Sequence, residues 1–174
     1  DYLPETGPFV LKGETNSRKS HWKRDMFANN KTEAIQIANR LSDDSLIGQQ
    51  KIYIRQYVPL FKYMDGVNGM PVTKEFRFFV AFGKVISGGF YWQNYVDDMG
   101  LTPLSNEVPV DFLAEVIKRV GNQSNFYTID VAQTIEGKWI VIELNEGQQA
   151  GLSCNNPNTL YPALVQAIQE NLIS

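Results

Sequence analysis

The chain has 174 residues, of which 43% are hydrophobic, and carries a formal net charge of −3. That length fits one compact domain or two small subdomains, and the acidic balance excludes a general basic field that would recruit nucleic acid or an anionic membrane. The single cysteine excludes an internal disulfide and favours a cytoplasmic location, and no apolar run approaches the roughly 18 to 20 residues of a membrane span.

The first sixty residues predict one helix between short strands. Residues 8–12 (PFVLK) are apolar and end on a lysine, which indicates a strand. Residues 13–30 are polar, basic and aperiodic, which indicates a long loop, and long loops in compact domains often cover or bind a ligand. Residues 31–44 have apolar side chains at helical spacing, with Thr32 as the expected N-cap. Residues 51–60 alternate between apolar and polar side chains and predict another strand.

Beyond residue 61 the pattern changes to hairpins separated by helices. The first hairpin is expected to turn near Gly83-Lys84 and the second at Glu136-Gly137, because glycine accepts the backbone conformations of tight turns. Hairpins form antiparallel sheets, so the sequence predicts an α+β fold with two small subdomains, residues 1–60 and 61–174. The predicted elements are hairpins at 74–92 and 126–144 and helices at 109–120 and 158–173.

The second hairpin carries a group of polar side chains. Asp130 lies early in its first strand, and Glu143 and Asn145 lie late in its second strand, two residues apart and therefore on one face. A turn at residues 136–137 places Glu143 opposite Asp130. Two carboxylates and one amide oxygen are hard ligands, which suit Mg²⁺ bound together with substrate phosphates. The alternative interpretation is an acidic strand end that is simply solvated by water.

Basic side chains occur within the predicted strands, where a charge is costly unless it is paired. Lys12 ends the first strand, Arg55 and Arg77 lie inside later strands, and Arg77 alternates with Glu75 on one face. Cations that hold phosphate oxygens beside two metal-binding carboxylates are what a nucleoside triphosphate requires. The predicted loop adds four cations, Arg18, Lys19, Lys23 and Arg24. For the last two, a solvated surface charge is the favoured interpretation.

Together these segments resemble the ATP-grasp superfamily, which includes ATP-dependent carboxylate–amine ligases. The resemblance covers most of the chain and implies two α+β subdomains that hold ATP between antiparallel sheets. In FVLKG, Lys12 matches the lysine that holds the α-phosphate, and IDVAQTIEGKWIVIELN carries the Mg²⁺ ligands Asp130, Glu143 and Asn145. The other nucleotide contacts that it implies are Arg18 and Lys19 in the covering loop, Gln56, Tyr57 and Val58 at the hinge beside the adenine, and Glu75 on the central hairpin.

Three features depart from the family pattern. Many members carry an arginine two residues before the first acidic ligand, where this chain has Thr128, so the resemblance leaves oxyanion stabilisation to Arg77 or Arg55, as in the clade with extra arginines and a lysine. Covering loops in the family are usually glycine-rich, whereas this one has only Gly13. Members also have a substrate-binding domain before the first strand. Here we expect that domain to be a separate partner, removed, or replaced by another substrate platform.

The resemblance implies phosphoryl transfer from ATP to a carboxylate, followed by attack of an amine or similar nucleophile on the acyl phosphate. His21 and Cys154, each the only residue of its type, have no partners at a recognisable catalytic spacing, so a serine or cysteine hydrolase is not indicated.

Two other classes of function compete with this interpretation. One is a nucleotide-binding sensor or assembly module without ligase activity. The other is single-strand nucleic-acid binding through Tyr91, Trp92 and Tyr95, since aromatic side chains can stack on bases. Against the second, we favour a packed strand end for these aromatic residues.

Overall fold

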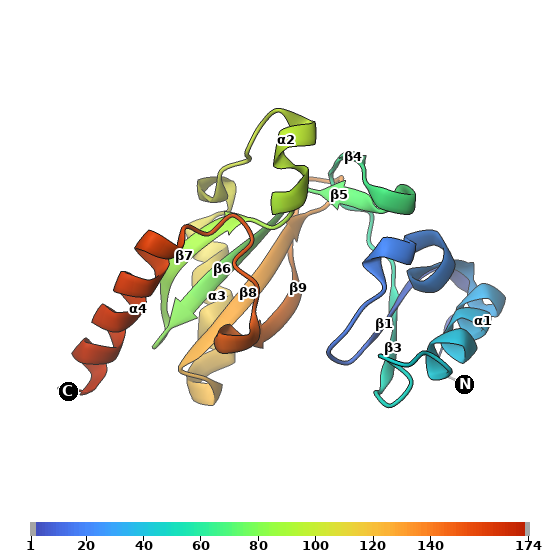
Figure 1. Cartoon of the computed structure of the whole chain (residues 1–174), viewed down its shortest axis with the longest axis horizontal. Helices are drawn as coiled ribbons and strands as arrows, with labels where there is room; N and C mark the ends of the chain where they lie inside the picture. Colours follow the sequence, from blue (N-terminus) through green and yellow to red (C-terminus); the bar gives the residue numbers. More distant parts are fainter. Residues whose placement is uncertain (1–2, 173–174) are drawn as a thin grey trace. The chain divides into compact units, whose positions relative to one another are not determined.

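The computed structural model describes residues 3–172, and the chain divides into two compact units (Figure 1). The N-terminal unit extends to Pro59 and also includes Met64–Val72. Leu60–Tyr63 and the chain from Thr73 onward form the C-terminal unit. The division is therefore not a single cut in the sequence. Each unit combines helices with an antiparallel sheet, which confirms the predicted α+β class.

The sheet of the N-terminal unit has three antiparallel strands in the order β2-β1-β3. The central strand, β1 (Thr6–Gly13), pairs with β2 (Phe27–Asn30) and with β3 (Ile52–Gln56). Because successive side chains of a strand point to opposite faces, one face of β1 is apolar and packs against helix α1 (Lys31–Ser42). The buried core between them consists of Phe9, Leu11, Ala28, Ala34, Ile37, Leu41 and Ile47.

The predicted loop at residues 13–30 is more ordered than the sequence suggested. Lys19–His21 and Trp22–Met26 form single helical turns, and the chain then enters β2. The Phe27 ring stacks on Trp22, with centroids 6.0 Å apart, so aromatic contacts help to hold this segment. The prediction of a continuous loop was therefore wrong for its second half, because these contacts are tertiary and leave no periodic pattern in the sequence.

Helix α1 begins at a different cap from the one predicted. The N-cap is Asn30, not Thr32, and its Oδ1 accepts a hydrogen bond from the Glu33 amide at 3.0 Å. In return, Glu33 Oε2 accepts from the Asn29 amide at 2.8 Å. These reciprocal bonds satisfy two N–H groups that have no partner inside the helix, in the manner of a capping box.

A two-stranded ribbon that the sequence did not predict follows β3. It pairs β4 (Lys62–Asp65) with β5 (Pro71–Thr73), and the unit boundary falls within both strands. At its tip, Asn68 and Gly69 adopt positive φ angles of 54° and 73°. Strands this short are below the length at which alternation can be recognised in a sequence.

The sheet of the C-terminal unit has four antiparallel strands in the order β7-β6-β8-β9. Every residue of β6 is buried, because it is an interior strand that is covered on both faces. The first hairpin turns at Phe82 and Gly83, both with positive φ, close to the predicted position. The four strands are β6 (Glu75–Ala81), β7 (Lys84–Phe90), β8 (Phe126–Gln133) and β9 (Trp139–Glu146).

Two long helices accompany this sheet, as predicted. In Figure 1, α3 (Val110–Val120) runs behind the sheet, and α4 (Pro157–Leu172) lies beside β7. Helix α2 (Val96–Met99) is a single turn. Within residues 3–172, no helix combines the length and the apolar character needed to cross a membrane. Further single turns lie at Val67–Gly69, Gln93–Tyr95, Ser105–Glu107, Gly121–Gln123 and Gly147–Gln149.

Candidate functional site

The β8–β9 hairpin brings together the three predicted metal ligands. Asp130 lies directly opposite Glu143, and Thr128 lies directly opposite Asn145. Residues directly opposite in an antiparallel pair share a face, and so do residues two apart in one strand. Asp130, Glu143 and Asn145 therefore lie on one face of the sheet, which confirms the predicted pairing of the two carboxylates.

A β-bulge, rather than the turn alone, sets this pairing. The loop between the strands has three residues, Ile135 to Gly137, because the Thr134 amide donates to the Lys138 carbonyl at 2.8 Å. The register then shifts between Asp130 and Val131, where β9 accommodates one extra residue. The sequence argument assumed a regular two-residue turn and reached the right pair without the bulge. Bulges of this kind re-aim the side chains beside them.

Arg77 and Asp130 form a buried ion pair at the centre of this face. Arg77 lies directly opposite Asp130 across β6 and β8. Its Nε donates to Asp130 Oδ1 at 2.8 Å and its Nη2 to Oδ2 at 2.6 Å, in a bidentate arrangement. The side chains are only 9% and 1% exposed. Burial alone would lower the pKa of Arg77, but the hydrogen bonds and charge of Asp130 outweigh burial and raise it.

The segment after β9 returns to hold Arg77 in place. Arg77 Nη1 donates to the Gly151 carbonyl at 2.9 Å, so all three guanidinium nitrogens have protein acceptors. The buried Asn155 donates from Nδ2 to the Arg77 carbonyl at 3.2 Å, and its Oδ1 accepts from Ser87 Oγ at 2.5 Å. Sequence reasoning did not identify Asn155, because its partners are 68 and 78 residues away in the chain.

Glu75 and the aromatic residues lie next to Arg77. Glu75 is buried, and its Oε2 accepts a hydrogen bond from Thr73 Oγ1 at 3.1 Å. The same hydroxyl accepts from Trp92 Nε1 at 3.2 Å. The Arg77 guanidinium carbon lies 4.9 Å from the Tyr91 ring centroid, a cation–π contact, and Tyr91 meets Trp92 edge-on. These aromatic side chains thus take part in packing around the ion pair.

In the N-terminal unit, two of the predicted cations share a face of the sheet. Lys12 pairs with Tyr53, and Val10 pairs with Arg55, so Lys12 and Arg55 lie on the face opposite the α1 core. Lys12 is partly buried, whereas Arg55 is exposed. The hinge residue Tyr57 donates its amide to the Pro8 carbonyl at 2.9 Å, which ties the end of β3 to β1.

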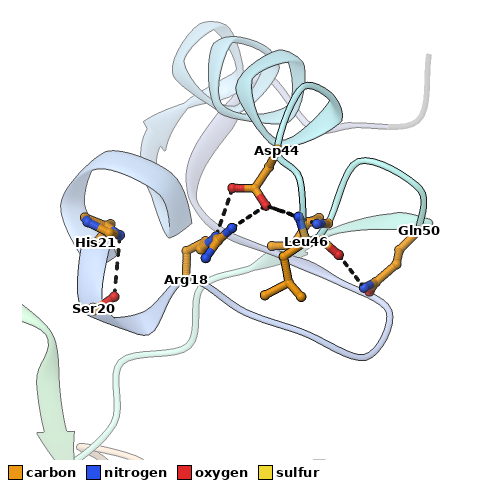
Figure 2. Close-up of polar contacts among 7 residues, drawn as sticks. Arg18, Ser20, His21, Asp44, Leu46 and Gln50 are labelled. Atoms are coloured by element: carbon orange, nitrogen blue, oxygen red, sulfur yellow. Dashed lines mark hydrogen bonds and ion pairs between the residues drawn. The ribbon is translucent and has the colours of Figure 1, made fainter.

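Arg18 has a partner that the sequence did not indicate. Figure 2 shows its guanidinium facing the Asp44 carboxylate, with Nε to Oδ2 at 2.9 Å and Nη2 to Oδ1 at 2.5 Å. The neighbouring Lys19 is partly buried at the start of a helical turn, and His21 is exposed. The bond to Arg18 and those from backbone amides hold the pKa of Asp44 down at about 2.

Comparison with known proteins identifies the family. The matching family model is described as an ATP-grasp domain, family 3 of the clade named for two arginines and a lysine, and it covers residues 2–166. The chain belongs to this ATP-grasp family. No curated protein sequence gives a significant match.

Solved structures share the ATP-grasp fold over nearly all of the chain. A RimK domain protein from Sphaerobacter thermophilus superposes with a TM-score of 0.51 at 17% identity, over 92% of this chain and 51% of that protein. The ATP-grasp ligase PsnB, bound to the precursor peptide PsnA2 and AMPPNP, gives 0.54 at 11% identity, over 95% and 46%. PsnB with a precursor variant, Mg and ADP gives 0.53 at 12% identity, also over 95% and 46%. The present chain thus spans about half the length of these proteins.

The donors on the β8–β9 face of the ATP-grasp domain suit a magnesium ion in part. Asp130, Glu143 and Asn145 offer carboxylate and amide oxygens on one face, which is the ligand chemistry of Mg²⁺. Among residues 3–172, no group of three or more His, Cys, Asp or Glu side chains could hold a metal ion. Oxygens from a bound phosphate would complete the shell, as is usual for magnesium in nucleotide sites.

Proposed function

We propose that this ATP-grasp domain binds Mg-ATP and belongs to a ligase that activates a carboxylate as an acyl phosphate. The observation that carries the proposal is the strand register that sets Asp130 opposite Glu143 and places Asn145 on the same face. The family assignment and the ligases among the solved structures support it. Magnesium binding is assigned to the β8–β9 face, and phosphate binding to the face of the N-terminal sheet that carries Lys12.

Each group has a role in this proposal. Lys12 and Arg55 hold phosphate oxygens, since both lie on the sheet face opposite the α1 core. Because Tyr57 already donates its amide to Pro8, the backbone donor to the adenine edge is assigned to Val58. Asp130, Glu143 and Asn145 hold magnesium, which when bound neutralises charge on the β- and γ-phosphates.

The proposed reaction proceeds in two steps. A carboxylate oxygen of the substrate attacks the γ-phosphorus, the bond to the bridging oxygen breaks, and ADP leaves. An amine or similar nucleophile then attacks the acyl carbon, and inorganic phosphate leaves with the oxygen. Arg77 sits beside the metal ligands, where it would stabilise the charge that develops on oxygen. To do so it must share its protons with Asp130 and Gly151, its acceptors in this structure.

The proposal is tested by Glu143→Gln with Glu146→Gln as the matched control. Both substitutions remove one carboxylate from β9, but Glu146 pairs with Tyr127 and lies on the opposite face, where it accepts from Gln148. We expect Glu143→Gln to abolish the magnesium-dependent part of ATP binding, measured by titration calorimetry with and without Mg²⁺, and the control to bind like the wild type. Equal binding by both variants would contradict the metal assignment.

A nucleotide-binding module without ligase activity is the second candidate. The observation that favours it is the guanidinium of Arg77, whose three nitrogens are all engaged by protein acceptors. A phosphate-release assay separates the two functions, because both bind Mg-ATP but only the ligase turns it over. Tight binding with no release of phosphate in the presence of candidate carboxylates and amines would favour the module.

A further inference from the structure

The basic loop after β1 is fastened to a short segment that follows helix α1. The loop residues are 14–18, and the segment, which we call the platform, is residues 44–50. The loop touches the platform at two points, Thr15 and Arg18. Figure 2 shows the second of these contacts, with Asp44 between Arg18 and the backbone of Leu46. A covering loop was expected to be free to move, so these attachments call for an explanation.

Asp44 is a preorganised acceptor for Arg18. Its carboxylate receives hydrogen bonds from the Leu46 amide at 2.8 Å and the Ile47 amide at 3.1 Å, in addition to the two from Arg18. Ile47 is fully buried in the core beneath the sheet, which anchors the turn. The carboxylate is therefore oriented by its own backbone before Arg18 arrives, and little side-chain freedom is lost when the pair forms.

Gln50 provides the second attachment. Its Oε1 accepts from the Thr15 amide at 3.0 Å and from Thr15 Oγ1 at 3.1 Å, while its Nε2 donates to the Leu46 carbonyl at 2.9 Å. Gly13 permits this approach, because a Cβ there would lie 2.8 Å from Gln50 Oε1 and 2.9 Å from Ile47 Cγ2. Both ends of the loop thus rest on the same platform.

We propose that Arg18 anchors the covering loop to Asp44 and that Asp44 and Gln50 are positioning residues for Mg-ATP binding. The inference rests on the proposed ATP site and changes the predicted role of Arg18 within it. Arg18 would not be a phosphate ligand, because turning its guanidinium to phosphate would leave Asp44 without its strongest partner. The anchored loop instead fixes the start of the helical turn that carries Lys19, which keeps its predicted role as a phosphate contact.

The anchor acts on affinity through order. A loop that is held before ATP arrives need not be ordered at the moment of binding. Releasing it should weaken Mg-ATP binding about tenfold, which corresponds to the cost of fixing about one backbone residue. The same release should speed amide hydrogen exchange in residues 14–20 of the nucleotide-free protein, because exchange reports local opening.

The test compares Arg18→Gln, Asp44→Asn and the double variant with the wild type. Lys31→Gln serves as the control, since it removes an equally charged, ion-paired side chain, bonded to Glu5 at 2.6 Å, from another part of the same unit. Titration calorimetry gives the Mg-ATP affinity, and exchange mass spectrometry gives the order of the loop. We expect both single variants to lose affinity alike and to exchange faster, the double variant to be no worse than either, and the control to match the wild type.

Other outcomes would overturn the inference in recognisable ways. If Arg18 binds phosphate directly, Arg18→Gln will weaken binding while Asp44→Asn leaves it unchanged or tighter. If the anchor has no role in loop order, exchange in residues 14–20 will not change in either variant. If the wild type binds no Mg-ATP, the proposed function fails. The exchange measurement would then still decide whether Asp44 holds the loop.

Discussion

Asp130→Asn removes one charge from the buried pair with Arg77 while keeping the shape of the side chain. In the wild type, the two side chains are 9% and 1% exposed and share two short hydrogen bonds. Removing one partner of such a pair leaves a buried charge uncompensated, which typically costs about 3 to 5 kcal/mol. An asparagine oxygen can still accept one bond, and the Gly151 carbonyl and Tyr91 ring remain. We therefore expect the lower end of that range, about 3 kcal/mol.

Urea denaturation measures this loss as a change in the free energy of unfolding. Trp92 and Trp139 both lie in the C-terminal unit and report its unfolding by fluorescence. The double variant Arg77→Met, Asp130→Leu serves as a reference, because replacing both charges by apolar groups of similar size is often neutral or stabilising. A cost below about 1 kcal/mol for Asp130→Asn would refute the reasoning, since that is the range of solvated surface pairs.

Three other sites give further predictions. Lys12→Ala should weaken Mg-ATP binding about tenfold to a hundredfold in calorimetry, because a charged hydrogen bond is lost; unchanged affinity would remove Lys12 from the phosphate site. Gly89→Ala should destabilise the C-terminal unit by about 1 to 3 kcal/mol in urea, because the new Cβ would lie 2.6 Å from the backbone of Cys154 and Asn155; wild-type stability would show that this turn can move. The folded-state pKa of Asp44 is lowered from 3.8 to about 2, so its contribution to stability is complete above about pH 4 and is lost as the pH falls through 2; Asp44→Asn should flatten the acid unfolding curve in that range, and parallel curves would contradict the pair.

The sequence predicted the elements that have strong periodic patterns. Both long hairpins and the helices at residues 31–44, 109–120 and 158–173 appear close to their expected positions. Periodicity works here because each element buries one face in its own unit. The ribbon at Lys62–Thr73 was missed because strands of four and three residues show no such pattern.

The site was predictable to the extent that it depends on local pairing. Asp130 and Glu143 lie in one hairpin, so the position of the turn was enough to bring them together. The partner of Arg77 was not predictable, because it depends on the pairing of β6 with β8, 53 residues apart in the chain. The partner of Arg18 was missed for the same reason, since Asp44 is 26 residues away. A charge inside an apolar strand does signal that some partner exists, but not which one.

The return of Met64–Val72 to the N-terminal unit has a practical consequence for dissecting the chain. A fragment that stops at Pro59 would lack a piece of its own unit, including Asn68, whose Nδ2 donates to the Ser20 carbonyl at 2.7 Å. The side chain of Lys23 also lies against Gly69, close enough that a Cβ there would meet it at 2.6 Å. Neither unit can therefore be expressed whole by truncation at one peptide bond. A split-protein or domain-exchange design would have to carry residues 64–72 with the N-terminal half, for example on a new linker after residue 59.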